Sequence, residues 1–282
     1  MPGLLSGWKQ ELQIKGSSLQ ACQGIVTTYE RVVKMNEKKT ILIVEDDKYI
    51  VNFMSMTLKD EGYGYYVAKS VKEAISLFYA NQPDMILLDE PFSALDVFLK
   101  DRLQQEMIEI LADYEGTVIL VSHSRDEIYR FSEELLIMDS GQVICCGNTK
   151  EIFANPQWKE AARLTGCKNI TQVTHLGTNT LMAPDWGVAL ELHREVPADI
   201  RYIGIRAHDF IPRWGDTAEN CLPVKVNSMA ELQFERKYFL KGAKDCAEEV
   251  CWFVQRNDWN MLDEKGIPDY LQVPEDKILL LK

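Results

Sequence analysis

Acidic side chains occur in two groups, and each group directly follows an apolar run. The first is Glu45-Asp46-Asp47, which follows Ile41–Val44, and the second is Asp89-Glu90, which follows Met85–Leu88. In an open α/β sheet, residues that follow parallel strands lie at the edge where ligands bind. Carboxylate oxygens at such an edge suit a hard divalent cation. The alternative for the first group is that the acids only favour the start of a helix.

The strands that would position these acids belong to a regular alternation of strands and helices. The expected strands span residues 41–44, 65–68, 85–88, 117–121 and 135–138. Segments with apolar residues at helical spacing separate most of them. This alternation predicts an α/β fold, in which helices cover a mostly parallel sheet in three layers.

The pattern changes after Asn155-Pro156. Short strand-like runs broken by Gly, Pro and Asn follow, and they predict a separate β-rich domain, a small barrel. Residues before Met35 show no clear pattern. We therefore expect a poorly structured extension at 1–34, sheet-forming segments at 35–84 and 85–165, and a β domain at 166–282.

The first acidic group has the setting of a signalling family. The run ILIVEDD at 41–47 and the run DMILLD at 84–89 resemble the bacterial response-regulator receiver domain. The resemblance implies that Asp46 and Asp47 hold Mg²⁺ and that Asp89 is the phosphoacceptor. It also implies a histidine kinase as the partner.

The chain departs from the receiver pattern after the third strand. The family has a hydroxyl after the fourth strand, which Ser122 can supply, and a lysine after the fifth, where this chain has Asp139. A negative charge there is wrong for stabilising a phosphoryl group. Glu90-Pro91-Phe92 also replaces the residues that follow the phosphoacceptor. The resemblance thus favours receiver ancestry more than a working phosphorylation switch.

A second resemblance begins at the same strand. The run MILLDEPFSALD at 85–96 resembles the Walker B motif and D-loop of ABC ATPases. The run VILVSHSRDE at 118–127 resembles their switch strand, or H-loop. The resemblance implies that Asp89 orients Mg²⁺ and that Glu90 polarises the attacking water.

The ABC resemblance assigns two further residues, Asp96 to the D-loop contact across the nucleotide sandwich and His123 to the γ-phosphate of ATP. The segment with which ABC ATPases bind the phosphates of ATP is missing from this sequence. No GxxxxGK[ST] occurs in the sequence, so the backbone N–H cradle and the lysine for the phosphates are absent. A Q-loop and a convincing LSGGQ signature are absent as well. We expect weak ATP binding at most, and no autonomous ATPase activity.

The two resemblances overlap at 83–89, because both families place there an apolar strand that ends in an acid. Asp89 therefore has two candidate roles, phosphoacceptor and Mg²⁺ ligand. The families imply different strand orders: first and third strands are neighbours in receivers, whereas the ABC switch strand lies between the Walker A and Walker B strands. We expect a hybrid with a receiver-like sheet of five strands, because the count of strands is then complete.

Three runs in the β-rich region carry a third resemblance. LTGCKN at 164–169, APDWG at 183–187 and YIGIRAHDF at 202–210 resemble the TOBE extension of molybdate-type importer ATPases. The resemblance implies a regulatory barrel that binds oxyanions in some members, with Arg206 and His208 as the polar groups of interest. The alternative is that these two side chains only pack or pair on the surface.

The overall charge limits the partners. The formal net charge is −12, which argues against nucleic-acid binding because that needs a basic face. No apolar run approaches the roughly 20 residues of a membrane-spanning helix. We expect a cytoplasmic protein, docked at the inner face of the membrane on permease subunits, with a second ATPase subunit as a further partner.

Three interpretations remain open. The first is an importer ATP-binding subunit of the molybdate type that lacks Walker A and is inactive alone. The second is a signalling module that is phosphorylated on Asp89. The third is a splice or assembly artefact, a chimera without an evolved function.

Overall fold

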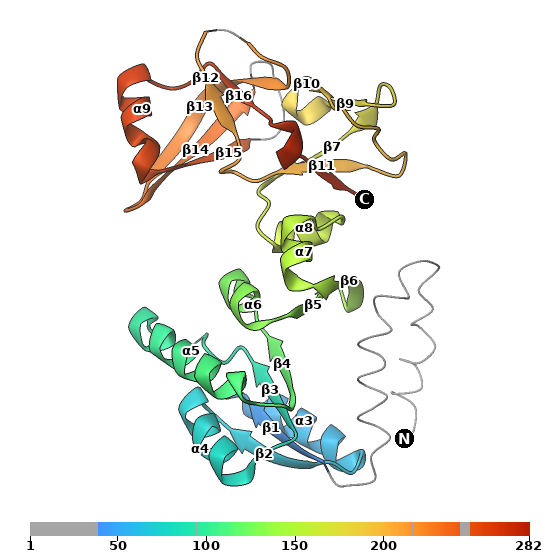
Figure 1. Cartoon of the computed structure of the whole chain (residues 1–282), viewed down its shortest axis with the longest axis vertical. Coiled ribbons are helices and arrows are strands. Elements are labelled where there is room, and N and C mark those ends of the chain that lie inside the picture. The colour runs from blue at the N-terminus through green and yellow to red at the C-terminus, as the bar shows by residue number, and fades with distance from the viewer. Residues whose placement is uncertain (1–38, 94, 216, 243–248) are drawn as a thin grey trace. The chain divides into compact units, whose positions relative to one another are not determined.

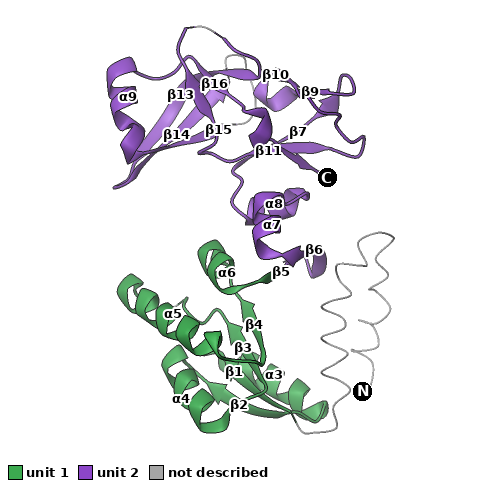
Figure 2. Cartoon of the chain, in the orientation of Figure 1, with its two compact units in different colours: residues 1–135 green, residues 136–282 purple. Residues whose placement is uncertain are grey.

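The computed structural model describes residues 39–93, 95–215, 217–242 and 249–282. The chain divides into two units, residues 1–135 and 136–282 (Figure 2). The extension expected at 1–34 lies outside the described residues. No helix in the described ranges is long and apolar enough to cross a membrane.

A parallel sheet organises the first unit (Figure 1). Its strand order is β2-β1-β3-β4, with the bounds β1 Thr40–Val44, β2 Gly64–Ala68, β3 Met85–Asp89 and β4 Thr117–Val121. Leu87 of β3 pairs with Ile43 of β1 on one side and with Ile119 of β4 on the other. Since all pairs are parallel, the acids that follow β1 and β3 lie at the same edge.

Helices follow each strand of this sheet. They are α3 (Lys48–Asp60), α4 (Val71–Asn81), α5 (Val97–Ala112) and α6 (Arg125–Phe131). Asp47, Ser70 and Asp96 cap the first three of them, because each side chain accepts a backbone N–H of the first turn. The Glu73 carboxylate in turn accepts the Lys69 N–H at 2.8 Å, so Ser70 and Glu73 together bind two backbone donors at the start of α4.

The core of the first unit lies against one face of the sheet. Leu42 and Leu88 from the strands are buried in one cluster with Ala74 from α4 and with Leu103 and Met107 from α5. Alternate residues along β1 and β3 point to this face, as the two-residue period of a strand requires. Burial of these side chains fixes the register of the strands, since a shift by one residue would expose all of them.

The fifth strand expected in this sheet is not part of it. Residues Glu134–Asp139 form β5, which pairs with β6 (Gln142–Asn148) in a separate two-stranded sheet. The turn Ser140-Gly141 joins them, and both residues have positive φ, 49° and 78°, as a tight hairpin requires. Because this turn returns the chain at once, β5 pairs with its nearest neighbour in sequence. The five-stranded expectation is wrong, whereas the expected pairing of the first and third strands is confirmed.

The division between the two units falls within strand β5. Strands β1 and β2 come from the segment 35–84 and strands β3 and β4 from the segment 85–165, and the four strands share one sheet. The first unit ends at Leu135 and the second begins at Leu136. Helices α7 (Thr149–Ala154) and α8 (Lys159–Leu164) therefore belong to the second unit.

Antiparallel strands make up most of the second unit. They form sheets in the orders β10-β9-β8, β17-β11-β7 and β12-β16-β13-β14-β15. The bounds are β7 Asn169–Gln172, β8 Thr174–His175, β9 Thr180–Ala183, β10 Val188–Glu191, β11 Tyr202–Ile205, β12 Ile211–Arg213, β13 Cys221–Glu231, β14 Glu235–Gly242, β15 Val250–Gln255, β16 Tyr270–Gln272 and β17 Leu279–Leu281, with helix α9 at Trp259–Lys265. The α/β class, with a parallel sheet followed by a β-rich region, is confirmed. The β-rich region is divided among several sheets in the described residues and is not one closed sheet.

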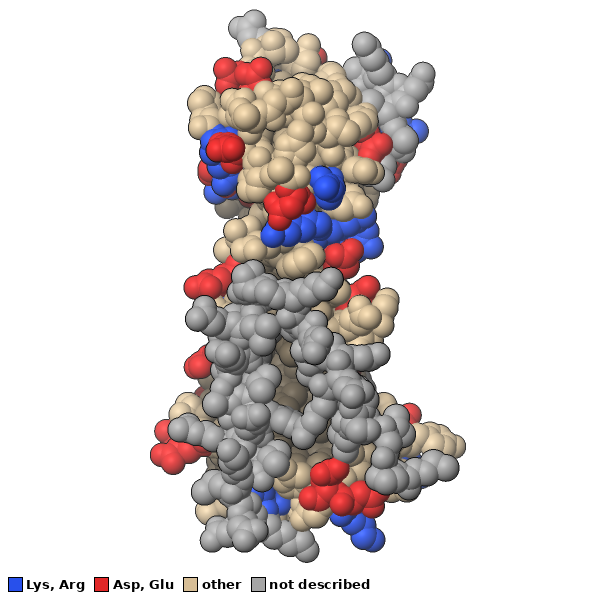
Figure 3. Space-filling view, turned by 90° about the vertical axis from the view of Figure 1, so that its right-hand side faces the viewer, with Lys and Arg blue, Asp and Glu red and all other residues tan. Residues whose placement is uncertain are grey.

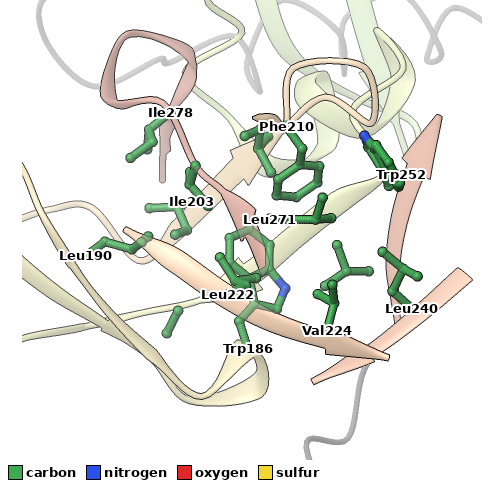
Figure 4. Packing of buried hydrophobic residues seen from close by; sticks show 14 of the residues in the cluster. Trp186, Leu190, Ile203, Phe210, Leu222, Val224, Leu240, Trp252, Leu271 and Ile278 are labelled. Atoms are coloured by element: carbon green, nitrogen blue, oxygen red, sulfur yellow. The ribbon is translucent and has the colours of Figure 1, made fainter. Parts of the chain in front are cut away.

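Among the described residues, the larger of two clusters of buried side chains forms the main core of the second unit (Figure 4). It includes Trp186, Ile203, Leu240, Trp252 and Leu271, each at most 3% exposed. These residues come from strands of different sheets and from the 3₁₀ turn at Pro184–Trp186. The three sheets thus contribute to one hydrophobic core.

Candidate functional site at the carboxyl edge of the parallel sheet

Strand β3 ends in Asp89, and Glu90 follows in an unusual backbone conformation. The φ angle of Glu90 is 44°, in the left-handed region that residues other than glycine seldom adopt. Its N–H donates to Val121 O on β4 at 2.9 Å, and its carbonyl accepts from Ser93 N and Ser93 Oγ at 3.1 and 2.9 Å. These bonds hold Glu90 at the edge where β3 and β4 end.

The Glu90 carboxylate meets His123, which follows β4. His123 Nδ1 lies 2.7 Å from Glu90 Oε1, and the His123 backbone N–H donates to the same oxygen at 2.8 Å. The imidazole is otherwise open, with 80% of the side chain exposed. The structure therefore brings together two of the residues that the ABC resemblance assigns, a carboxylate and an imidazole in direct contact just after two neighbouring strands.

The residues on either side of His123 are tied to helices α5 and α6. Ser122 Oγ donates to Glu127 Oε2 at 2.5 Å, and it accepts the Ser124 N–H at 3.0 Å. The Glu127 carboxylate also pairs with Lys100 Nζ at 2.5 Å. The Ser122 hydroxyl, which the receiver resemblance implicates, is thus engaged with Glu127.

Glu45, which follows β1 and to which neither resemblance assigns a role, is a further acid at this edge. Glu45 is only 7% exposed, and this burial is the main reason why the pKa of its carboxyl is raised. The Asp47 N–H donates to the carboxylate at 2.7 Å and acts in the opposite direction, because it lowers the pKa. The negative charge of Asp89 and contacts with the Asp46 and Asp89 side chains raise the pKa further. Glu45, Asp46 and Asp89 therefore form the acidic cluster at this edge.

Asp47 and Asp96 are placed differently from their implied roles. Asp47 Oδ1 accepts the N–H groups of Tyr49 and Ile50 at 2.7 and 3.3 Å, so this carboxylate caps α3. Asp96 Oδ1 accepts the Leu99 N–H at 3.0 Å and caps α5. The alternative that an acid after β1 serves a helix start holds for Asp47.

The arrangement does not fit a pre-formed magnesium site. Among the residues that the structure describes, no group of three or more His, Cys, Asp or Glu side chains is placed to hold a metal ion. Asp46 and Asp89 both lie near Glu45, but Asp47, the second member of the implied pair, is turned to its own helix.

Arg206 and His208, in the second unit, each have partners of their own. Arg206 donates to Thr165 O at 2.8 Å and to Phe153 O, so its guanidinium holds carbonyls near the ends of α8 and α7. His208 Nε2 lies 3.5 Å from Glu235 Oε2. A neighbouring carboxylate does not favour an anion, and this geometry corresponds to the alternative of packing and pairing.

The surface charge agrees with the acidic composition. On the described part of the face in Figure 3, Asp and Glu side chains lie at many separate places, and Lys and Arg side chains at fewer. The formal net charge of the whole chain is −12.

Curated relatives of the chain are ATP-binding subunits of ABC importers. It is 32% identical over 162 residues to the molybdate/tungstate import ATP-binding protein WtpC of Pyrococcus horikoshii, an alignment that covers 56% of this chain and 46% of that protein. It is 33% identical over 107 residues to the Fe(3+) ions import ATP-binding protein FbpC of Haemophilus influenzae, covering 38% of this chain and 30% of that one. It is 30% identical over 152 residues to the sulfate/thiosulfate import ATP-binding protein CysA 2 of Chromobacterium violaceum, covering 53% and 41%. The matches span less than half the length of these relatives, and no protein-family model matches the chain.

Likeness to solved structures is weak. The molybdate-binding protein ModG with molybdate bound gives a TM-score of 0.32 at 11% identity, covering 41% of this chain and 97% of ModG. A response regulator receiver domain from Methanoculleus marisnigri gives 0.23 at 23% identity, covering 33% of this chain and 92% of that domain. Neither score supports a statement about the fold of this chain.

Proposed function

We propose that this chain acts as an ATP-binding-subunit-like protein of a molybdate-type importer and does not hydrolyse ATP alone. The observation that carries the proposal is the contact of Glu90 with His123 after the neighbouring strands β3 and β4, with 2.7 Å between Oε1 and Nδ1. The similarity to importer ATP-binding proteins supports it. The fused receiver-like segment at 35–84 is part of the same proposal.

In this proposal Glu90 and His123 serve as an acid–base pair at the edge of the sheet. The imidazole keeps the carboxylate oriented, and the carboxylate is the group that can polarise a water molecule. ATP would supply the γ-phosphate as the reacting group, but the chain has no glycine-rich loop to hold the other phosphates. The expected partners are permease subunits and a second ATP-binding subunit at the inner face of the membrane.

The test uses protein labelled with ¹⁵N only at its four histidines. Addition of Mg·ATP at millimolar concentration, the range of weak binding, should shift the His123 signals and leave the other three unchanged. Hydrolysis should not exceed the rate without protein. No shift at His123 would contradict the nucleotide site, and hydrolysis lost in Glu90→Gln would contradict the lack of autonomous activity.

A second candidate function is phosphorylation of Asp89, favoured by the proximity of the Glu45 carboxylate to the Asp89 side chain. A small phosphodonor such as acetyl phosphate should then label the chain, and Asp89→Asn should abolish the label while Asp84→Asn keeps it. The pairing of Ser122 with Glu127 opposes a switch that needs the hydroxyl to move. Absence of label on the unmodified chain would exclude this function.

A further inference from the structure

Glu127 on α6 is a buried charge with two partners. Its side chain is only 4% exposed, and its carboxylate receives Lys100 Nζ from α5 at 2.5 Å and Ser122 Oγ from the end of β4 at 2.5 Å. A buried carboxylate is costly unless a cation and hydrogen-bond donors compensate it. The three residues therefore depend on one another for their positions.

The network reaches His123 through the backbone. Ser122 Oγ, while donating to Glu127, accepts the Ser124 N–H at 3.0 Å, so one hydroxyl holds both ends of the segment 122–124. His123 lies between these ends with 80% of its side chain exposed. Since little packing surrounds the ring, its direction depends on the segment that carries it.

We propose that Glu127, together with Lys100, is a positioning residue. It fixes the segment 122–124 through Ser122 and thereby holds the N–H and Nδ1 of His123 on the Glu90 carboxylate. The inference rests on the proposed function only for the chemical role of His123. Its test involves no nucleotide, so its failure and the failure of the proposed function are distinguishable.

The experiment measures hydrogen exchange at the histidine amides of the ¹⁵N-histidine-labelled full chain. In Glu127→Gln one oxygen becomes an amide NH₂, which cannot accept from either Lys100 or Ser122. The His123 amide should then exchange roughly tenfold faster, as expected when a hydrogen bond to a charged acceptor is lost. His193 is a matched internal control, because its N–H and Nδ1 contact the Glu275 carboxylate at 2.7 and 2.6 Å in the same way. Its amide should not change.

Further variants separate positioning from general destabilisation. Asp126→Asn removes a neighbouring, exposed acid of α6 and should leave all four amides unchanged. Glu90→Gln should accelerate hydrogen exchange at the His123 amide. In the double variant Glu90→Gln/Glu127→Gln the exchange should be little faster than in Glu90→Gln alone, because both changes disrupt the same coupled arrangement.

The proposal is overturned by unchanged His123 exchange in Glu127→Gln, by equal acceleration of all four amides, or by additive effects in the double variant. Should Glu127→Gln not fold, Lys100→Met tests the same network, since it leaves the Ser122 bond in place. It should accelerate the His123 amide alone, by less than Glu127→Gln is expected to. No acceleration in Lys100→Met would count against the proposal.

Discussion

At the scale of single residues, Asp84 ties the beginnings of the first and third strands together. Its Oδ2 accepts the Thr40 N–H at 2.8 Å and the Thr40 hydroxyl at 3.2 Å, and Lys39 Nζ lies 3.5 Å from its Oδ1. The Thr40 N–H is the main cause that lowers the pKa of this carboxyl. Asp84 thus stabilises the pairing of β1 with β3 through its charged form.

We expect Asp84→Ala to lower the free energy of unfolding at neutral pH by about 1 kcal/mol, the usual value of such hydrogen bonds at a partly exposed site. Because the folded pKa is lowered, the contribution is complete above the unfolded value of about 3.9 and is lost as the pH falls through the folded pKa. Urea unfolding of both proteins at neutral and strongly acidic pH measures it. Asp60→Ala, at an exposed position at the end of α3, is the control. A difference that persists at the acidic pH would contradict this account.

The acids after β1 show how much of the site the sequence could predict. The apolar run that ends at Val44 predicts that acids follow at the edge of the sheet, and they do. It could not predict which carboxylate turns to Asp89, because the free N–H groups at the start of α3 compete for the side chains. Asp47 is bound by those groups, and Glu45 lies in the acidic cluster instead.

At the scale of elements, Gly116 controls the entry into β4. A Cβ atom at this position would lie 2.2 Å from the Tyr114 ring and 2.7 Å from Asp84 O. The Tyr114 hydroxyl donates to Pro83 O at 2.9 Å, so the ring is held against the beginning of β3. The absence of a side chain at 116 is therefore required for β3 and β4 to begin side by side.

Gly116→Ala should destabilise the first unit by about 1–3 kcal/mol, the cost of overpacking against a backbone atom. Thermal or urea unfolding of the variant measures the loss. Gly177→Ala is the control, because a Cβ there meets only Thr180 Oγ1 at 3.9 Å. Equal stability of the two variants would show that the Tyr114 ring and the backbone near Asp84 move aside without cost.

The local sequence predicts where the strands of the first unit lie, but it does not predict every pairing between strands. The run at 117–121 predicts β4 with its observed bounds, since β-branched residues and the flanking glycine mark it. The run at 135–138 predicts a strand as well, yet its partner is decided by the Ser140-Gly141 turn rather than by its own residues. The pairing of a strand depends on the adjoining turn and on the other strands of the sheet, so it cannot be predicted from the residues of that strand alone.

At the scale of the whole molecule, the described residues contain a separate hydrophobic core in each unit. Leu88 belongs to the core of the first unit, and Trp252 belongs to that of the second. The first core includes side chains from both the receiver-like segment and the ABC-like segment, among them Leu42 and Leu103.

Leu88→Ala should destabilise the first unit by roughly 2–5 kcal/mol, and Trp252→Ala should destabilise the second by roughly 3–5 kcal/mol. Calorimetry should show two unfolding transitions, and each variant should lower the midpoint temperature of one of them. The effects should add in the double variant, because the residues share no packing partners. A single broad transition without cooperativity in the unmodified chain would favour the artefact interpretation.

The left-handed conformation of Glu90 has a consequence for the evolution of this chain. An L-residue there costs roughly 1–2 kcal/mol that glycine would not. Glu90→Gly should therefore raise the melting temperature while it removes the carboxylate that His123 contacts. A screen that rewards only thermostability would select this substitution, whereas selection on the chemistry would retain the acid, so position 90 is one where adaptation for stability and for activity oppose each other.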